Sequence, residues 1–183
     1  MAICKLNTNL TRANQCGYSL PEIVELYLVN YEDLTNTKLA PEEETEDGCR
    51  EISGITLASG ATVAKVEPAK NSASFEDTLV VEDSGNKYRN ASITFNVTGT
   101  YNGCMHGALD ALSLGRYFVV VKTADGNYLG FGRISPLEAE TATLAGGSDN
   151  NGLQIVLSGN IAESPMPLTD EAVDTIKAAV ITG

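Results

Sequence analysis

The sequence predicts a mainly β protein, an antiparallel β-barrel or sandwich with one packed α-helix and a short C-terminal helix. Between residues 51 and 159, short runs of β-forming residues alternate with turn residues, and the connections have the length of hairpins. One helical stretch, at residues 102–114, interrupts this pattern. Antiparallel strands with a single helix among them favour a barrel or sandwich over a parallel α/β fold.

Length and composition indicate one globular domain with two appendages. The chain has 183 residues, of which 43% are hydrophobic and 20% charged, enough to bury a core without disulfides. Residues 1–21 are predicted to form an N-terminal arm, because asparagine, glutamine, glycine and proline break any periodicity there. Residues 22–164 form the predicted barrel domain, with an acidic loop at 41–48 and a helix at about 103–114. Residues 165–183 form the predicted C-terminal helical tail.

The first strands are predicted from apolar runs. Glu22–Asn30 mixes isoleucine, valine, leucine and tyrosine and reads as a well-buried strand. Ile52–Leu57 and Thr62–Glu67 follow as two short strands, and Ala58–Gly60 between them resembles a hairpin turn.

The next two strands are predicted to form a long antiparallel hairpin. Ser72–Glu82 and Lys87–Thr98 are separated by the turn residues Asp83–Asn86. In the second strand, apolar residues such as Ile93 and Phe95 alternate with polar ones, the period expected of a half-buried strand.

The helix is predicted within Asn102–Leu114. Met105, Ala108, Leu109 and Leu112 follow one another at i, i+3, i+4 and i+7, which places them on one face of a helix.

The remaining strands of the barrel follow the helix. Arg116–Lys122 is the clearest strand of all, and Asp125-Gly126 is the dipeptide typical of a type I′ turn. The predicted return strand is Asn127–Arg133. Glu138–Leu144 and Leu153–Ser158 complete the set.

The tail contains a predicted amphipathic helix, Thr169–Ile181. Thr169 can cap its start, and two acidic residues follow in the first turn, where the helix dipole favours negative charge. Val173, Ile176 and Val180 form one apolar stripe. Since an isolated helix of this length is marginal in water, we expect the stripe to dock on its own barrel or on a neighbouring subunit.

The charge balance disfavours several classes of partner. Asp plus Glu number 24 and Lys plus Arg number 12, so the formal net charge is -12. Such a chain is ill suited to neutralising phosphates of nucleic acid or to binding an anionic membrane surface. We expect no membrane span and, because Met1–Leu10 has no apolar core, no secretory signal. Synthesis and folding in a cytoplasm are therefore expected.

The cysteines predict neither a metal site nor disulfides. Cys4, Cys16, Cys49 and Cys104 contain no CxxC pair, and His106 is the single histidine, so four free thiols are expected. Cys104 beside His106 is conceivable as a nucleophile and base. Residues at i and i+2 do not share a helix face, however, which favours a structural role.

No sequence motif indicates an enzyme or a cofactor. The chain has no GxSxG, HExxH or P-loop motif, and no GxGxxG follows a strand. Glu76 and Asp77 are adjacent on a predicted strand, so their side chains should point to opposite faces rather than form a paired-carboxylate site. We therefore expect no enzymatic activity and no cofactor.

Two groups of carboxylates are candidates for an interface or for the wall of a channel. The loop at 41–48 is predicted to be solvated, and it lacks the ligand pattern of an EF-hand, although an ion bound there stays an open alternative. The second group lies beside the predicted hairpin. The candidates are Glu42, Glu43, Glu44, Glu46, Asp47, Glu76, Asp77, Glu82 and Asp83.

From about Val63 to Leu168 the chain resembles bacteriophage tail-tube-type and head–tail neck ring proteins, including those of crAss-like Bacteroides phages. The resemblance lies in the order of four segments: SASFEDTLVVEDSGNKYRNASITFNV, the helix GCMHGALDALSLG, RYFVVVKTADGNYLGFG, and GLQIVLSGNIAESPMPL. The single motifs are degenerate, and neither the arm nor the acidic loop is covered.

The resemblance implies a non-enzymatic virion protein. Such proteins form sixfold or twelvefold homo-oligomeric rings around a channel through which DNA passes without specific binding, in contact with other tail or neck proteins. The implied location is the tail or neck of the virion, after assembly in the host cytoplasm. The alternative is a small bacterial β-sandwich module that binds a peptide or a carbohydrate; the low aromatic content, 6% with no tryptophan, counts against sugar stacking.

Overall fold

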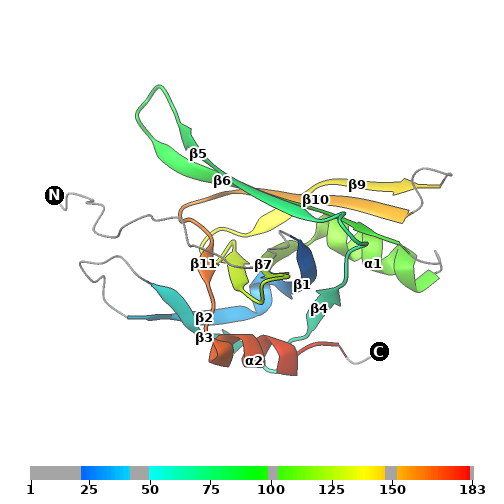
Figure 1. The fold of residues 1–183 in the computed structure, drawn as a ribbon, viewed down its shortest axis with the longest axis horizontal. Helices are drawn as coiled ribbons and strands as arrows, with labels where there is room; N and C mark the ends of the chain where they lie inside the picture. Colours follow the sequence, from blue (N-terminus) through cyan, green and yellow to red (C-terminus); the bar gives the residue numbers. More distant parts are fainter. Residues whose placement is uncertain (1–21, 42–49, 99–102, 147–151, 182–183) are drawn as a thin grey trace, which may run out of the picture.

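A computed structural model describes residues 22–41, 50–98, 103–146 and 152–181, and the fold is mainly β (Figure 1). The strands are β1 (Ile23–Asn30), β2 (Leu34–Ala40), β3 (Glu51–Leu57), β4 (Val63–Val66), β5 (Ser74–Val81), β6 (Lys87–Val97), β7 (Arg116–Thr123), β8 (Tyr128–Phe131), β9 (Leu137–Ala145), β10 (Gly152–Ile161) and β11 (Met166–Pro167). The helices are η1 (Tyr31–Asp33), α1 (Gly103–Leu114) and α2 (Asp170–Ala178).

Nine strands form one bent antiparallel sheet. Its path is β11-β8-β7-β9-β10-β6-β5, and β1 joins it by pairing with both β7 and β4. The bend lies where β7 meets β9, which share only the pairs Arg116↔Glu138 and Tyr117↔Leu137. Within the described residues β5 pairs only with β6 and β4 only with β1, so the predicted antiparallel, mainly β class is confirmed but the barrel is not closed.

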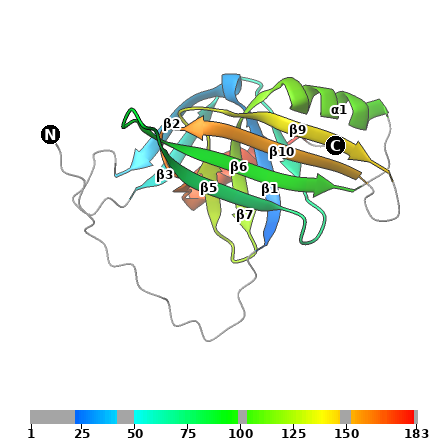
Figure 2. The same cartoon turned by 90° about the horizontal axis from the view of Figure 1, so that it is seen from above.

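The two halves of the sheet face each other across the upper core (Figures 1 and 2). We call the buried cluster between them the upper core; its members include Leu28, Ile93, Phe95, Val119 and Leu157. Under the half built on β1 and β7 lies a second cluster, the lower core, which β2, β3 and α2 cover. The lower core includes Tyr27, Val29, Ile52, Phe118 and Ile176.

The central strands β1 and β7 are buried on both faces. Leu26 and Leu28 of β1 point into the upper core, whereas Tyr27 and Val29 point into the lower core. A strand covered on both sides buries side chains on both faces, which is why Leu26–Val29 of β1 and Tyr117–Val121 of β7 are continuous apolar runs rather than alternating ones.

The predicted pairing of the two short strands after residue 50 is wrong. β3 pairs with β2 in a separate two-stranded sheet, and β4 crosses to the edge of β1, with Val63 opposite Val29. The physical reason is that Ile52 and Ile55 of β3 are buried in the lower core, which holds β3 below the main sheet. β2 was not predicted, because its sequence LTNTKLA has few apolar residues.

The β7–β8 connection is a hairpin, but its turn is not of type I′. Gly126 has a φ of 88°, whereas Asp125 is not among the described residues with positive φ. The amide of Gly126 donates to the carbonyl of Thr123 at 2.9 Å, and the amide of Thr123 donates to the carbonyl of Asn127 at 2.9 Å. This is a type I turn closed by a left-handed glycine, which spares Asp125 the strained conformation that type I′ would require.

The helix α1 packs on the edge of the upper core. Leu109 and Leu112 of the predicted stripe contact this core, Ala108 is exposed, and the side chain of Met105 lies outside the described residues. Leu114, at the end of the helix, is 87% exposed.

The C-terminal helix α2 packs on its own subunit. Val173 and Ile176 are buried, and Val180 is half-buried against the lower core. The backbone after the helix is tied to β4, because the amide of Val63 donates to the carbonyl of Ala179 and the amide of Ile181 to the carbonyl of Val63. Thr169 occupies the N-cap position without a capping bond; its hydroxyl donates to the carbonyl of Ser53 instead.

No helix in the described part of the chain has the length and apolar character required to span a bilayer.

Candidate assembly surface

The β5–β6 hairpin carries an exposed apolar row. It projects past the body of the molecule (Figure 1), and its register runs from Ser74↔Thr94 to Val81↔Lys87. The third strand, β10, reaches only as far as the pair Ile161↔Arg89, so the last pairs of the hairpin stand without a neighbouring strand among the described residues. The hairpin therefore ends as a free two-stranded tip.

One face of the hairpin packs on the upper core at its base and is exposed to solvent toward its tip. We call this face the inner face. It carries Phe75, Asp77, Leu79, Val81, Lys87, Arg89, Ala91 and Ile93, which share one side of the strands by alternation and register. Ala91 and Ile93 are fully buried, whereas Phe75, Leu79 and Val81 are 39%, 53% and 57% exposed. The exposure of the apolar side chains on this face thus rises toward the tip.

An ion pair sits in the middle of the inner face. The Arg89 guanidinium holds Oδ2 of Asp77 at 2.6 Å, and the Asp77 side chain is only 11% exposed. The hydrogen bond to Asp77 raises the pKa of Arg89, and burial of the guanidinium opposes this rise. This pair neutralises two charges within the apolar row. Asp77, a candidate for a channel wall, is therefore not a freely exposed carboxylate.

The opposite, outer face of the hairpin is acidic. Glu76 points to this face, as expected from its position next to Asp77, and its carboxylate accepts a hydrogen bond from Thr78 Oγ1 at 3.1 Å. Glu82 accepts bonds from Ser84 Oγ at 3.1 Å and Asn86 Nδ2 at 3.3 Å. Both are exposed, as is Asp83 in the turn. The structure thus separates the hairpin carboxylates into an outer, exposed set and the paired Asp77.

The other candidate carboxylates, Glu42, Glu43, Glu44, Glu46 and Asp47, lie outside the described residues.

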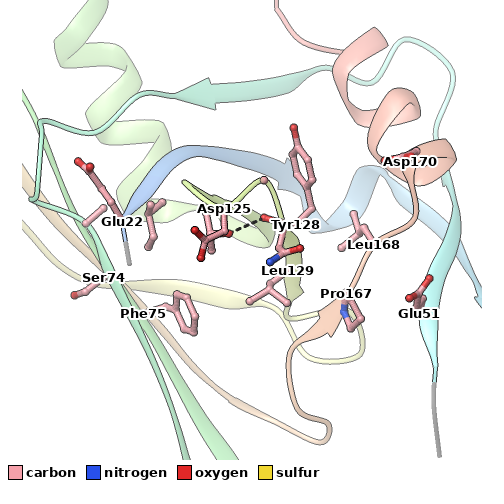
Figure 3. Close-up of a pocket in the computed structure, with 15 residues that line it drawn as sticks. Glu22, Glu51, Ser74, Phe75, Asp125, Tyr128, Leu129, Pro167, Leu168 and Asp170 are labelled. Atoms are coloured by element: carbon pink, nitrogen blue, oxygen red, sulfur yellow. Dashed lines mark hydrogen bonds between the residues drawn. The ribbon is translucent and has the colours of Figure 1, made fainter. Parts of the chain in front are cut away.

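A groove of about 660 Å³ lies between the base of the hairpin, the β7–β8 turn and β11 (Figure 3). Its apolar lining includes Phe75, Leu129, Pro167 and Leu168. We call it the carboxylate groove, because acidic side chains stand along it and none of the described residues that line it is basic. These acidic residues are Glu22, Glu51, Asp125 and Asp170.

Sequence reasoning did not find the carboxylate groove. Its acidic residues come from the start of β1, from β3, from the β7–β8 turn and from α2, so no local motif joins them. Asp125 belongs to the predicted turn, and Asp170 is one of the two acidic residues in the first turn of the predicted C-terminal helix, so each already has a local structural reason to be acidic. Only the bend of the sheet and the path of β11 bring them to one place.

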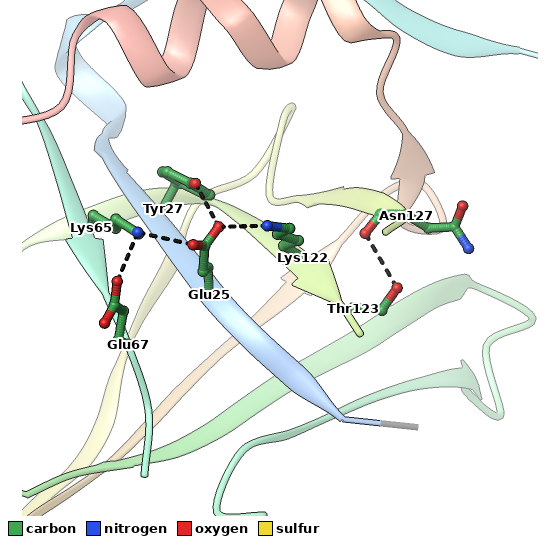
Figure 4. Close-up of polar contacts among 7 residues, drawn as sticks. All are labelled: Glu25, Tyr27, Lys65, Glu67, Lys122, Thr123 and Asn127. Atoms are coloured by element: carbon green, nitrogen blue, oxygen red, sulfur yellow. Dashed lines mark hydrogen bonds and ion pairs between the residues drawn. The ribbon is translucent and has the colours of Figure 1, made fainter. Parts of the chain in front are cut away.

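A separate ion-pair network fixes β1 between its neighbours β4 and β7 (Figure 4). The Glu25 carboxylate accepts a hydrogen bond from Tyr27 Oη at 2.8 Å and pairs with Lys65 at 2.9 Å and Lys122 at 3.1 Å. Burial acts to raise the pKa of Glu25, but the bonds from Lys65, Tyr27 and Lys122 prevail and lower it to about 2. Glu25 is thus ionised at neutral pH, which suits it to holding strands together and not to proton transfer.

The described residues contain no group of three or more His, Cys, Asp or Glu side chains that could hold a metal ion. Cys104 is an exposed free thiol on α1, and the Nε2 of His106 lies 3.6 Å from the Asp110 carboxylate one helical turn away. Cys4, Cys16 and Cys49 lie outside the described residues.

Comparisons of the chain with protein-family models, with curated proteins and with solved structures found no match.

Proposed function

We propose that this chain is a non-enzymatic structural subunit that forms a ring around a DNA channel in a phage tail or head–tail connector. The observation that carries the proposal is the apolar row of the inner face, which runs out of the upper core to an exposed tip beside an open strand edge. The order of the sequence segments supports the choice of a tail or neck protein. The virion is then its location, and other tail or neck proteins are its neighbours.

An exposed hairpin of this kind is costly for a solitary monomer. Leu79 and Val81 are more than half exposed, and in the described part of the chain no strand pairs with the second edge of β5. Proteins normally cover or charge such edges, because they attract further strands and promote aggregation. A ring of identical subunits covers apolar tips and edges in every copy at once.

The acidic outer face suits a channel for DNA. Glu76 and Glu82 are exposed there, and the chain as a whole carries a formal net charge of -12. Carboxylates repel phosphates over a Debye length of about 8 Å in physiological salt, so a polymer can slide past without retention. Basic side chains would do the opposite, since they release counterions and add affinity.

The test is the mass of the purified chain in solution. Sedimentation velocity and native mass spectrometry at tens of micromolar should give a closed oligomer of six or twelve chains. A strict monomer at every concentration would refute the ring and favour the alternative, a binding module that uses the carboxylate groove for a basic peptide.

A further inference from the structure

We propose that the inner face of the hairpin tip of one copy docks in the carboxylate groove of the next copy. This contact deepens the proposed ring, on which it rests, because it names the two surfaces that join neighbouring subunits. The tip contributes Leu79, Val81 and Lys87. The groove contributes its apolar lining and the carboxylates of Glu51 and Asp170.

The apolar parts of the two surfaces match in character. Leu79 and Val81 are the residues of the hairpin with the most exposed apolar side chains. The groove offers Leu129, Pro167 and Leu168, of which Leu129 and Leu168 are only half-buried in the single subunit. Docking would remove both sets from water, which stabilises the contact in proportion to the apolar surface covered.

The charges also match, and they fix which face of the tip can dock. Lys87 lies opposite Val81 on the inner face, is exposed, and has no ion pair within the described part of the chain. The groove residues Glu51 and Asp170 are exposed carboxylates. The outer face carries Glu76 and Glu82 instead, and like charges would keep it out of the groove.

The tip cannot reach the groove of its own subunit. Phe75, at the base of the hairpin, lines the groove, and Val81 follows six residues later on the same strand. At about 3.3 Å per residue, Leu79 lies about 13 Å and Val81 about 20 Å along the strand from Phe75. The contact has to be made between copies. It joins two different surfaces, and repeated head-to-tail contacts of this type close into rings when the rotation permits.

The apolar half of the contact is tested with Leu79→Ser/Val81→Ser. Both side chains are exposed and outside the core, so the fold should keep its thermal stability, whereas the subunit association constant should fall at least about tenfold. Leu114→Ser is the matched control, because Leu114 is an even more exposed leucine on α1. Equal loss in the control, or wild-type assembly of the double variant, would overturn the proposal.

The charged half is tested by exchanging charges between the surfaces. Lys87→Glu alone and Glu51→Lys/Asp170→Asn alone should each impair assembly, while an equimolar mixture of the two should assemble again as an alternating ring. Lys38→Glu on β2 is the control for an exposed lysine away from the tip. A mixture that stays dissociated, or single variants that assemble as well as the Lys38→Glu control, would overturn the proposal.

These outcomes are separable from the failure of the ring itself. If the wild-type chain forms a ring that the tip and groove variants leave intact, the docking contact is wrong and the ring stands. If the wild-type chain stays monomeric, both are wrong.

Discussion

The replacement of Glu25 by Gln tests how much the β4–β1–β7 ion-pair network contributes to folding. Lowering the pKa of Glu25 from 4.5 to about 2 corresponds to about 3 kcal/mol, at roughly 1.4 kcal/mol for each pKa unit. The Glu25 side chain is 19% exposed, so solvent screens this interaction only in part, and about 3 kcal/mol is an upper estimate. Glu25→Gln should therefore lower the free energy of unfolding at pH 7 by about 1–3 kcal/mol.

The same contribution has a definite dependence on pH. A carboxyl group with a lowered pKa in the folded state stabilises fully above its unfolded pKa, here 4.5, and loses that effect as the pH falls toward about 2. The difference in unfolding free energy between wild type and Glu25→Gln should therefore be constant from pH 7 to about 5 and shrink below it.

Urea unfolding at a series of pH values, at protein concentrations low enough to avoid association, measures this difference. Glu67→Gln is the matched control: Glu67 also pairs with Lys65, at 2.8 Å, but its side chain is 70% exposed, so its loss should cost less than about 1 kcal/mol. A Glu25→Gln effect no larger than that of the control, or one unchanged between pH 7 and 2, would refute the reasoning.

Three further predictions follow from the lower core, the first residue of β10 and the outer face of the hairpin. Ile176→Ala should lower the free energy of unfolding by about 2–5 kcal/mol in urea titrations, because Ile176 is 1% exposed in the lower core; a loss below about 1 kcal/mol would show that α2 is not docked. Gly152→Ala should destabilise by more than about 1 kcal/mol, since φ is 144° and an added Cβ would lie 2.5 Å from the carbonyl oxygen of Val97; an unchanged melting temperature would contradict this. Glu76→Lys/Glu82→Lys should give the assembled protein a salt-dependent affinity for duplex DNA in fluorescence anisotropy, whereas Glu138→Lys/Glu140→Lys on β9 should not. No gain over that control would place the outer face away from the proposed channel.

Much of the fold follows from local patterns in the sequence. β7 and the β5–β6 hairpin were predicted because apolar runs, alternation and turn residues act within ten or so residues of one another. The C-terminal helix was predicted from the spacing of Val173, Ile176 and Val180, although the pattern left open whether its own domain or a neighbour would cover it. In the structure the chain itself buries Val173 and Ile176, and Ile176 belongs to the lower core.

The parts that sequence reasoning missed depend on tertiary placement. β2 is a strand because β3 lies beside it and the lower core holds β3 in place, not because of its own polar sequence. The same holds for the carboxylate groove, whose acidic residues are each explained locally and meet only in the folded chain. The two faces of the hairpin are an intermediate case: alternation predicted opposite directions for Glu76 and Asp77, but not the ion pair that buries Asp77 against Arg89.

Electron microscopy of the purified chain tests the central claim most directly. Class averages should show closed rings of one size with a central opening, and the Leu79→Ser/Val81→Ser variant should yield few or none of them at the same concentration. Particles of single-subunit size, or open filaments in place of rings, would contradict the account.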